Sequence, residues 1–194
     1  MHWDLESLIQ TVGYLGLFGI VFAETGLLVG FFLPGDTLLF SAGALAAGGK
    51  LEIPVVLITL FVASVLGNNV GYWWGKRLGP ALERRVRPDY LEKTHAFMNR
   101  FGPLAVVLGP FVPIVRTLTP FFCGATGYPW LRFASLNLVG SLLWTQGVTL
   151  LGFFLGKLIP PQIMERYLLL AVGTVVVVSL AFTVFETLRH RKAQ

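Results

Sequence analysis

The sequence contains little charge: Asp, Glu, Lys and Arg make up 13% of its 194 residues, whereas soluble domains average about 25%. So few charges cannot cover a water-facing surface, which excludes an ordinary soluble domain. The one cysteine, Cys123, excludes an intramolecular disulfide and a cysteine-based zinc site. The three histidines lie outside the apolar segments and show no partner pattern for nucleophilic or metal chemistry. We therefore expect no enzymatic activity, no metal and no cofactor.

Long apolar runs take the place of the missing charge. Segment 53–75 has no charged residue, and neither has 167–185. A run of about 20 apolar residues is long enough for a helix to cross the hydrocarbon of a bilayer. The sequence therefore predicts a single polytopic membrane domain of the all-α class. The predicted crossings are 8–29, 53–75, 130–156 and 167–186.

Basic residues gather in 76–100 and in the tail 187–194. Short segments rich in Lys and Arg stay cytoplasmic, so we expect both segments, and with them the two termini, on that side. After Pro88, apolar residues recur at helical spacing, which predicts an amphipathic helix on the cytoplasmic face. The run 84–87 has two interpretations, contact with anionic lipids or a plain topology signal, which is the commoner use. The net charge of +5 favours nucleic acid only on a soluble surface, so no nucleic-acid partner is expected.

Two apolar segments, 30–49 and 101–127, contain residues that break helices. An interior proline removes a helix hydrogen bond, and broken backbone survives at membrane depth only when it is buried in protein or lines a cavity. Moreover, both basic segments can be cytoplasmic only if one of the three apolar blocks between them enters and leaves on the same side. We therefore predict a re-entrant hairpin at 101–127 and a second one at 30–49. The residues expected to shape the hairpins are Pro34, Gly35, Pro113, Pro120 and Gly124.

The chain also shows a weak internal repeat. An offset of 81 residues pairs Phe40 with Phe121, Gly43 with Gly124, Gly71 with Gly152 and Gly75 with Gly156. Each copy is a hairpin followed by one crossing, and the predicted topology inserts the two copies in opposite directions. Paired broken segments in two inverted halves point to a transporter site. The alternative is an old duplication without a role in transport.

Four ionisable residues, Glu24, Asp36, Arg116 and Arg132, lie in apolar segments. Arg132 stands near Trp130 at the start of a crossing, where basic and aromatic residues anchor a helix to the interface, so we interpret it as structural. A charge in the bilayer interior costs at least about 2.5 kcal/mol, so such residues usually pair or line a pathway. The donor fork of Arg116 suits a phosphate or a carboxylate. A carboxyl group held between desolvation and a nearby cation can load and release a proton. We therefore predict a substrate-binding arginine with two proton-coupling acids, and the alternative is a buried ion pair that joins the hairpins.

Two asparagines, Asn68 and Asn137, are also polar residues at membrane depth. Hydrogen bonding between helices explains them, and the alternative is that they line the substrate cavity. Glycines 67, 71 and 75 have the four-residue spacing of close helix packing. This spacing leaves open whether they pack within the chain or form a homodimer contact.

Three motifs together resemble the bacterial DedA family, also called the SNARE-associated Golgi or VTT-domain family. They are FAETGLLVGFFLPGDTLLFSAGALA, VPIVRTLTPFFCGATG and FASLNLVGSLLW, and the resemblance runs from about Gly13 to Lys157. It implies an inner-membrane protein with two oppositely inserted hairpins that moves lipids between leaflets, notably undecaprenyl phosphate, or phospholipids in eukaryotic relatives. The family's functional acids would correspond to Glu24 and Asp36, and its second-hairpin arginine to Arg116.

The sequence departs from the family at two positions. Many members carry an arginine where this chain has Pro110, and some carry an acid at the position of Asn68. The leading hypothesis is a lipid transporter that binds an anionic headgroup at Arg116 and uses protons. The alternative is a proton-coupled carrier of small ions or drugs, which would use the same residues. A lipid-processing enzyme is disfavoured because no activated nucleophile is present.

Overall fold

The computed structural model describes residues 5–27, 35–83 and 88–158, and all of its regular secondary structure there is helical. The expectation of an all-α protein is confirmed for these residues. The predicted crossing 167–186, the tail 187–194, the run 84–87 and Pro34 lie outside the described residues. The helices are α1 (Leu5–Gly26), α2 (Gly35–Ala47), α3 (Ile53–Glu83), α4 (Pro88–Phe101), α5 (Leu104–Leu108), the short 3₁₀ helix η2 (Gly109–Phe111), α6 (Pro113–Ala125) and α7 (Trp130–Leu158).

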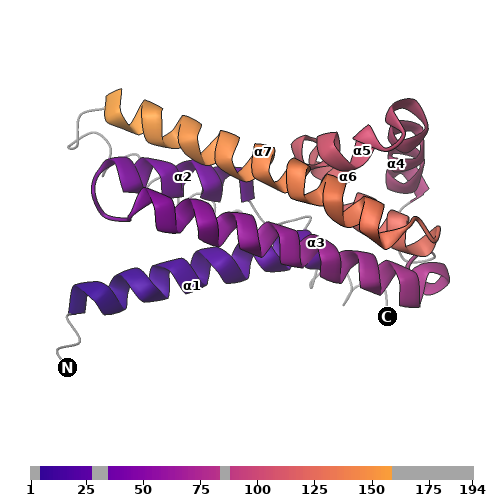
Figure 1. Cartoon of the computed structure of the whole chain (residues 1–194), viewed down its shortest axis with the longest axis horizontal. Helices are drawn as coiled ribbons and strands as arrows, with labels where there is room; N and C mark the ends of the chain where they lie inside the picture. Colours follow the sequence, from indigo (N-terminus) through magenta and orange to yellow (C-terminus); the bar gives the residue numbers. More distant parts are fainter. Residues whose placement is uncertain (1–4, 28–34, 84–87, 159–194) are drawn as a thin grey trace, which may run out of the picture.

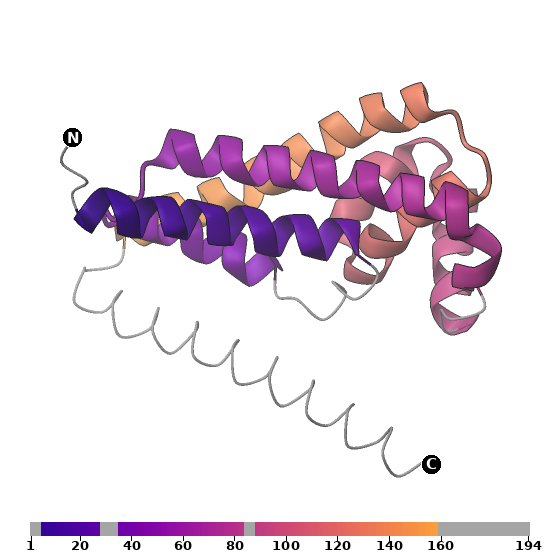
Figure 2. The ribbon, with the colours of Figure 1, turned by 90° about the horizontal axis from the view of Figure 1, so that it is seen from below.

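Two long helices, α3 and α7, form the frame of the molecule (Figure 1). Among the described residues they provide the two helices that are long and apolar enough to cross a membrane, Ile53–Gly79 and Trp130–Leu158. Several of their large apolar side chains are exposed, among them Ile58, Leu151 and Phe154. Large exposed apolar surfaces mark contact with another apolar phase, here the lipid. Helix α1 lies along α3 (Figure 2).

Helix α3 is longer than the predicted crossing 53–75, because it continues to Glu83. Basic residues such as Lys76 and Arg77 mark where a chain leaves the hydrocarbon, but they are good helix formers and do not end a helix. The next helix, α4, begins at Pro88, at the position expected for the amphipathic helix. It packs on α6, where the His95 ring meets Phe122 edge to face at 4.1 Å between ring centroids.

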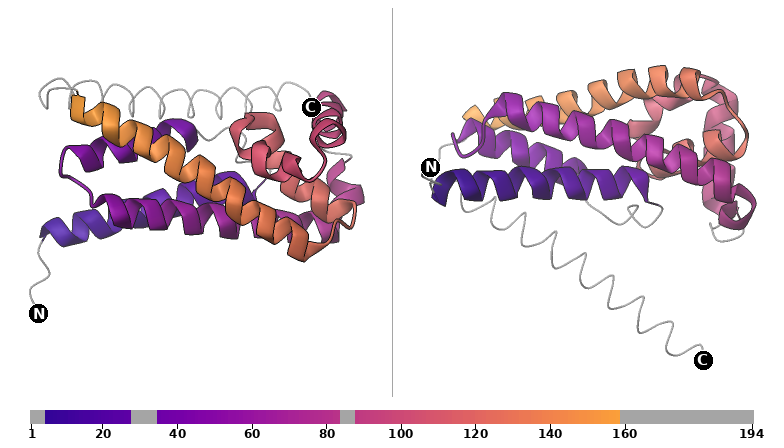
Figure 3. Two further views of the ribbon diagram at one scale, coloured as in Figure 1. Left: turned by 45° about the horizontal axis from the view of Figure 1, so that its top comes forward. Right: turned by 60° about the horizontal axis from the view of Figure 1, so that its bottom comes forward.

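The two short helices pack against the two long ones: α2 lies on α7, and α6 lies on α3 (Figures 1 and 3). Glycines allow this close approach. A Cβ atom at Gly152 would overlap the backbone of Phe40, and one at Gly75 would overlap the backbone of Phe121. The short helix of each repeat therefore packs on the long helix of the other repeat.

These contacts also correct the register of the repeat. Phe121 follows Phe40 by 81 positions, as the sequence comparison predicts, but Gly152 follows Gly75 by 77 positions. The structural counterpart of Gly75 is thus Gly152 and not Gly156, a shift of about one helical turn. The glycines recur every four residues, so a shift of four still superimposes glycines and misleads a sequence alignment.

The glycine spacing in α3 serves packing within the chain. A Cβ atom at Gly67 would meet Thr25 of α1, and one at Gly71 would come within 3.2 Å of Pro120 in α6. Of the two interpretations offered by the sequence, these contacts favour close packing over a homodimer contact at this face.

The segment 101–127 is broken, as its prolines predict. Val112 is extended (φ −117°, ψ 108°) and separates η2 from α6. Proline disfavours helical backbone in the residue before it and is well suited to the first position of a helix, so Pro113 both ends the preceding turn and starts α6.

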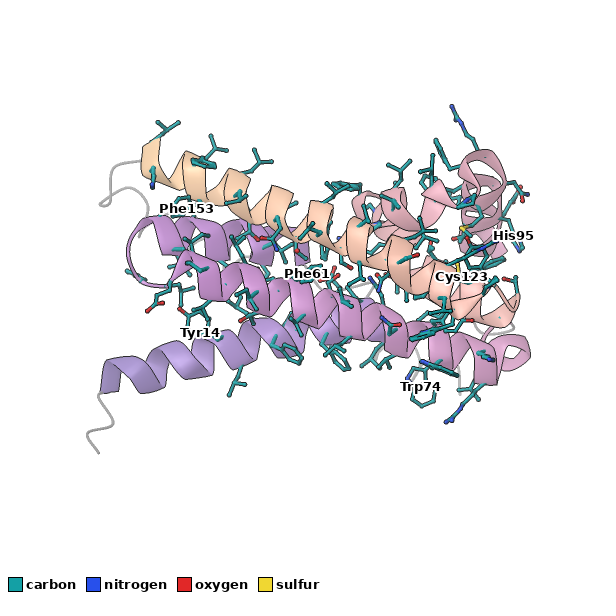
Figure 4. The ribbon with its side chains drawn as sticks, viewed as in Figure 1. Tyr14, Phe61, Trp74, His95, Cys123 and Phe153 are labelled. Carbon is teal, nitrogen blue, oxygen red and sulfur yellow. The ribbon has the colours of Figure 1, made fainter. Side chains whose placement is uncertain are left out.

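An apolar core fills the space where α1, α2, α3 and α7 meet. Its fully buried side chains include Val21, Leu39, Leu60 and Trp144. At one end of the molecule Tyr14 of α1 accepts a hydrogen bond from the backbone N–H of Glu52 at 2.8 Å. Figure 4 shows this residue far from Cys123, which is a fully buried free thiol near His95, while Trp74 points away from the helices.

Candidate functional site

Three of the four ionisable residues of the apolar segments, Glu24, Asp36 and Arg116, meet in one cluster. Glu24 lies near the end of α1, Asp36 in the first turn of α2, and Arg116 in the first turn of α6. Arg116 Nη1 donates to Asp36 Oδ1 at 2.9 Å, and Arg116 Nη2 donates to Glu24 Oε1. One guanidinium therefore joins the two acids, which stand 92 and 80 positions away in the sequence.

The cluster is buried at one end and accessible at the other. Glu24 is 1% exposed and the Arg116 side chain 6% exposed, whereas the Asp36 side chain is 52% exposed. A buried charge needs a partner to offset its desolvation, and Arg116 and Glu24 provide this for each other. Asp36 is thus the member of the cluster whose side chain is accessible from outside.

Local sequence explains how the acids come so close. A Cβ atom at Gly35 would overlap the Glu24 carboxylate, so only glycine lets the start of α2 approach α1 here. Asp36 follows in the first turn of α2, where the helix dipole favours a negative charge. Pro113 fixes the start of α6 and thereby places Arg116 in its first turn.

Trp144 of α7 is a member of the site that the sequence analysis missed. Its Nε1–H donates to Asp36 Oδ1 at 2.8 Å, and the Arg116 guanidinium lies over its ring, 4.5 Å from the centroid. The side chain is 1% exposed. A tryptophan within an apolar crossing gives no signal by itself, because the same residue type is common as plain packing.

Replacing Trp144 by phenylalanine tests this assignment. Phe retains an aromatic face for Arg116 but removes the hydrogen bond to Asp36, so we expect a loss of about 1 kcal/mol in the free energy of unfolding. Trp144→Ala also opens a cavity and should cost about 3–5 kcal/mol. Thermal unfolding in detergent measures both. Wild-type stability of Trp144→Phe would contradict the role of the indole N–H.

Pro110, one of the two positions at which the sequence departs from the resemblance described above, also contacts the cluster. Its backbone carbonyl accepts a hydrogen bond from Arg116 Nη1 at 3.4 Å. In this chain the residue therefore contributes an acceptor for the one arginine and not a second cation.

Asn68 and Asn137 lie beside the cluster in a polar network between α3 and α7. Asn68 Nδ2 donates to Asn137 Oδ1 at 2.8 Å, and Ser141 donates to the same oxygen at 3.1 Å. Ser64 donates to Ser141 at 2.9 Å. Ser64 and Ser141 are 77 positions apart, so they are equivalent residues of the two long helices. Both asparagines are nearly fully buried and also line a small cavity that reaches Arg116.

Two of the residues expected to shape the hairpins lie outside the cluster. Pro120 lies inside α6, and Gly124 packs against the backbone of Tyr72 in α3. Both hold α6 against α3, and Pro120 also lines a small cavity together with Arg116. Gly35 and Pro113 start the two short helices at the cluster itself.

Comparison with known proteins identifies the family. The VTT domain matches residues 33–154. Protein DedA of Escherichia coli (strain K12) is 40% identical over 205 residues, which cover 100% of this chain and 92% of the relative. The inner membrane protein YqjA of the same strain is 38% identical over 149 residues, 74% of this chain and 68% of the relative.

A relative from another organism is also similar to this chain. An uncharacterized membrane protein of Mycobacterium leprae is 39% identical over 143 residues, 71% of this chain and 64% of the relative. No solved structure matches the chain significantly. The matched region contains Asp36, Arg116 and Trp144. The chain is therefore a membrane protein that belongs to the VTT-domain family, to which DedA also belongs.

Proposed function

We propose that this protein moves lipids with anionic headgroups between the two leaflets of the bacterial inner membrane and that the headgroup binds Arg116. The observation that carries the proposal is a buried guanidinium paired with one buried carboxylate and one that is half exposed. Intramembrane ionisable residues are functional by default. A buried ion pair with only a structural role would not need an exposed member.

The chemistry of exchange follows from the hydrogen bonds. A phosphate offers the same kind of acceptor oxygens as a carboxylate, so a headgroup can take the place of Asp36 at Arg116 Nη1. Protonation of Asp36 weakens its bond to the guanidinium and favours this exchange. Glu24 meanwhile keeps Arg116 in place. Deprotonation of Asp36 then restores the original pair and releases the headgroup, which couples transport to protons.

The starts of α2 and α6 add to the attraction for anions. Gly35 and Asp36 lie in the first turn of α2, and Arg116 in the first turn of α6. The N-terminus of a helix carries a partial positive charge and free N–H groups that suit a phosphate. Both short helices direct these ends to the ionic cluster.

An apolar groove on the molecule suits the hydrocarbon part of a lipid. It has a volume of about 370 Å³ and lies between α1 and α3, lined by Tyr14, Leu15, Phe18, Ile58, Thr59 and Val62. In our proposal the chain of the lipid stays in this groove or in the bilayer while the headgroup passes Arg116. The family resemblance favours undecaprenyl phosphate as the lipid, with phospholipids as the other class.

We further propose that α2 and α6 belong to two re-entrant hairpins that enter the membrane from opposite faces. The packing of each short helix on the long helix of the other repeat supports this arrangement. Such repeats enclose the substrate site in many transporters. The basic segment 76–100 and both termini then lie in the cytoplasm.

Asp36→Asn is the variant that tests the proposal most cleanly. Asparagine keeps the shape and an acceptor oxygen, and the residue is half exposed, so the free energy of unfolding should change by less than about 1 kcal/mol. Translocation of a fluorescent polyprenyl phosphate in proteoliposomes should fall at least tenfold, because the proton exchange is lost. The matched control is Glu92→Gln, which changes an exposed acid of α4.

Undiminished translocation by Asp36→Asn would refute the assigned role of this acid. Substrate-dependent proton flux without any movement of headgroups would instead favour the alternative, a proton-coupled carrier of small ions or drugs.

A further inference from the structure

A small cavity adjoins Arg116 where α3, α5, η2, α6 and α7 meet. Its volume is about 10 Å³, and its polar lining residues are Asn68, Arg116, Thr119 and Asn137. A cavity of this size accommodates about one water molecule. It is too small for a phosphate, and a cation there would be repelled by the adjacent guanidinium.

Three buried polar atoms of these lining residues have no hydrogen-bond partner among the residues that the structure describes. They are Asn68 Oδ1, Arg116 Nε and Thr119 Oγ1. Their side chains are deeply buried, with 4%, 7% and 3% of each residue exposed. Buried polar groups in folded proteins are almost always satisfied by the protein or by ordered water, and an unsatisfied one is destabilising.

We propose that this cavity is a binding site for one water molecule that joins Arg116 to Asn68 and Thr119. The water accepts a hydrogen bond from Arg116 Nε–H and donates one to Asn68 Oδ1. Its second hydrogen goes to Thr119 Oγ1, or else the threonine hydroxyl donates to the water. Two to four such bonds are typical of a buried water, and each atom acts in its normal donor or acceptor role.

The water completes the anchoring of the guanidinium. Nη1 binds Asp36 and the Pro110 carbonyl, Nη2 binds Glu24, and the water binds Nε. Through Asn68 it also connects α6 to the polar network between α3 and α7. In terms of the proposed transport function, on which this step rests, Glu24 and the water hold the guanidinium in position after Asp36 releases it. Thr119 and Asn68 are then positioning residues for Arg116.

A structure of the purified protein at a resolution that shows ordered water tests the site without reference to transport. We expect one water peak within hydrogen-bond distance of all three atoms in the wild type and in Thr119→Ser, which keeps the hydroxyl. The peak should be lost in the isosteric variant Thr119→Val. The matched control is Thr149→Val, which removes another buried, unpartnered threonine hydroxyl outside this cavity and should leave the peak unchanged.

Absence of the peak in the wild type, or its persistence in Thr119→Val, would overturn the proposal. The wild-type result alone decides the question even if a variant fails to fold.

Lipid translocation tests the positioning role of Thr119 separately. Translocation should fall at least threefold in Thr119→Val and stay at the wild-type rate in Thr119→Ser and Thr149→Val. Full activity of Thr119→Val without the water would refute the positioning role. A wild-type protein that shows the water but moves no lipid would refute the proposed function and leave the water site established.

Discussion

Arg116→Met should abolish lipid translocation and lower the free energy of unfolding by about 3–5 kcal/mol, the usual loss when one partner of a buried ion pair is removed. Methionine fills much of the space over the Trp144 ring but leaves Glu24, which is 1% exposed, without its cation. Thermal unfolding in detergent and headgroup translocation in proteoliposomes measure the two effects.

The matched control is Arg132→Met, since Arg132 is an exposed arginine of α7 that sits outside the cluster. Its stability should stay within about 0.5 kcal/mol of the wild type. A second variant separates folding from function: in Glu24→Gln/Arg116→Met no charged buried partner is left over, so much of the stability should return while translocation stays absent. Wild-type translocation by any folded variant without Arg116 would contradict the assignment.

Gly75→Ala and Gly152→Ala should each lower the free energy of unfolding by about 1–3 kcal/mol, the usual range for overpacking. In each case the added Cβ atom overlaps the backbone of the short helix packed there, at Phe121 or at Phe40. Because backbone cannot move aside as a flexible side chain does, the helices must separate. The two losses should be similar, since the two glycines are equivalent in the repeat.

Gly147→Ala is the control for these two variants. It lies in α7 like Gly152, but nothing lies within 4 Å of the added Cβ atom. Alanine there should be neutral or more stable by up to about 1 kcal/mol, because it is the better helix former. Equal effects at Gly147 and Gly152 would show that helix propensity and not close packing governs these positions. They would refute the close contact between α7 and α2 at Gly152.

Much of the site could be predicted from sequence because charge is rare in this chain. Glu24, Asp36 and Arg116 stand out in apolar surroundings, and the cost of burying each of them implies partners. Which residues pair depends on the tertiary structure, because the cluster joins the starts of α2 and α6 to the end of α1. No local pattern specifies that arrangement.

Other features could not be predicted, for physical reasons. Trp144 is recognised only through the direction of its N–H and the cation above its ring. The register of the long helices differs by one turn from the one that the sequence repeat predicts, because glycines spaced by four residues align equally well after a shift of four. The extension of α3 to Glu83 cannot be read from the charge pattern, because charge marks the edge of the membrane and not the end of a helix.

In the proposed mechanism, Arg116 recognises the anionic headgroup of a lipid. The most direct measurement compares, in proteoliposomes, translocation of a fluorescent polyprenyl phosphate with that of the matching polyprenol, which lacks the phosphate. We expect the wild-type protein to accelerate movement of the phosphate only and Arg116→Met to abolish this acceleration. Equal acceleration of both lipids, or of the phosphate by wild type and Arg116→Met alike, would contradict this mechanism.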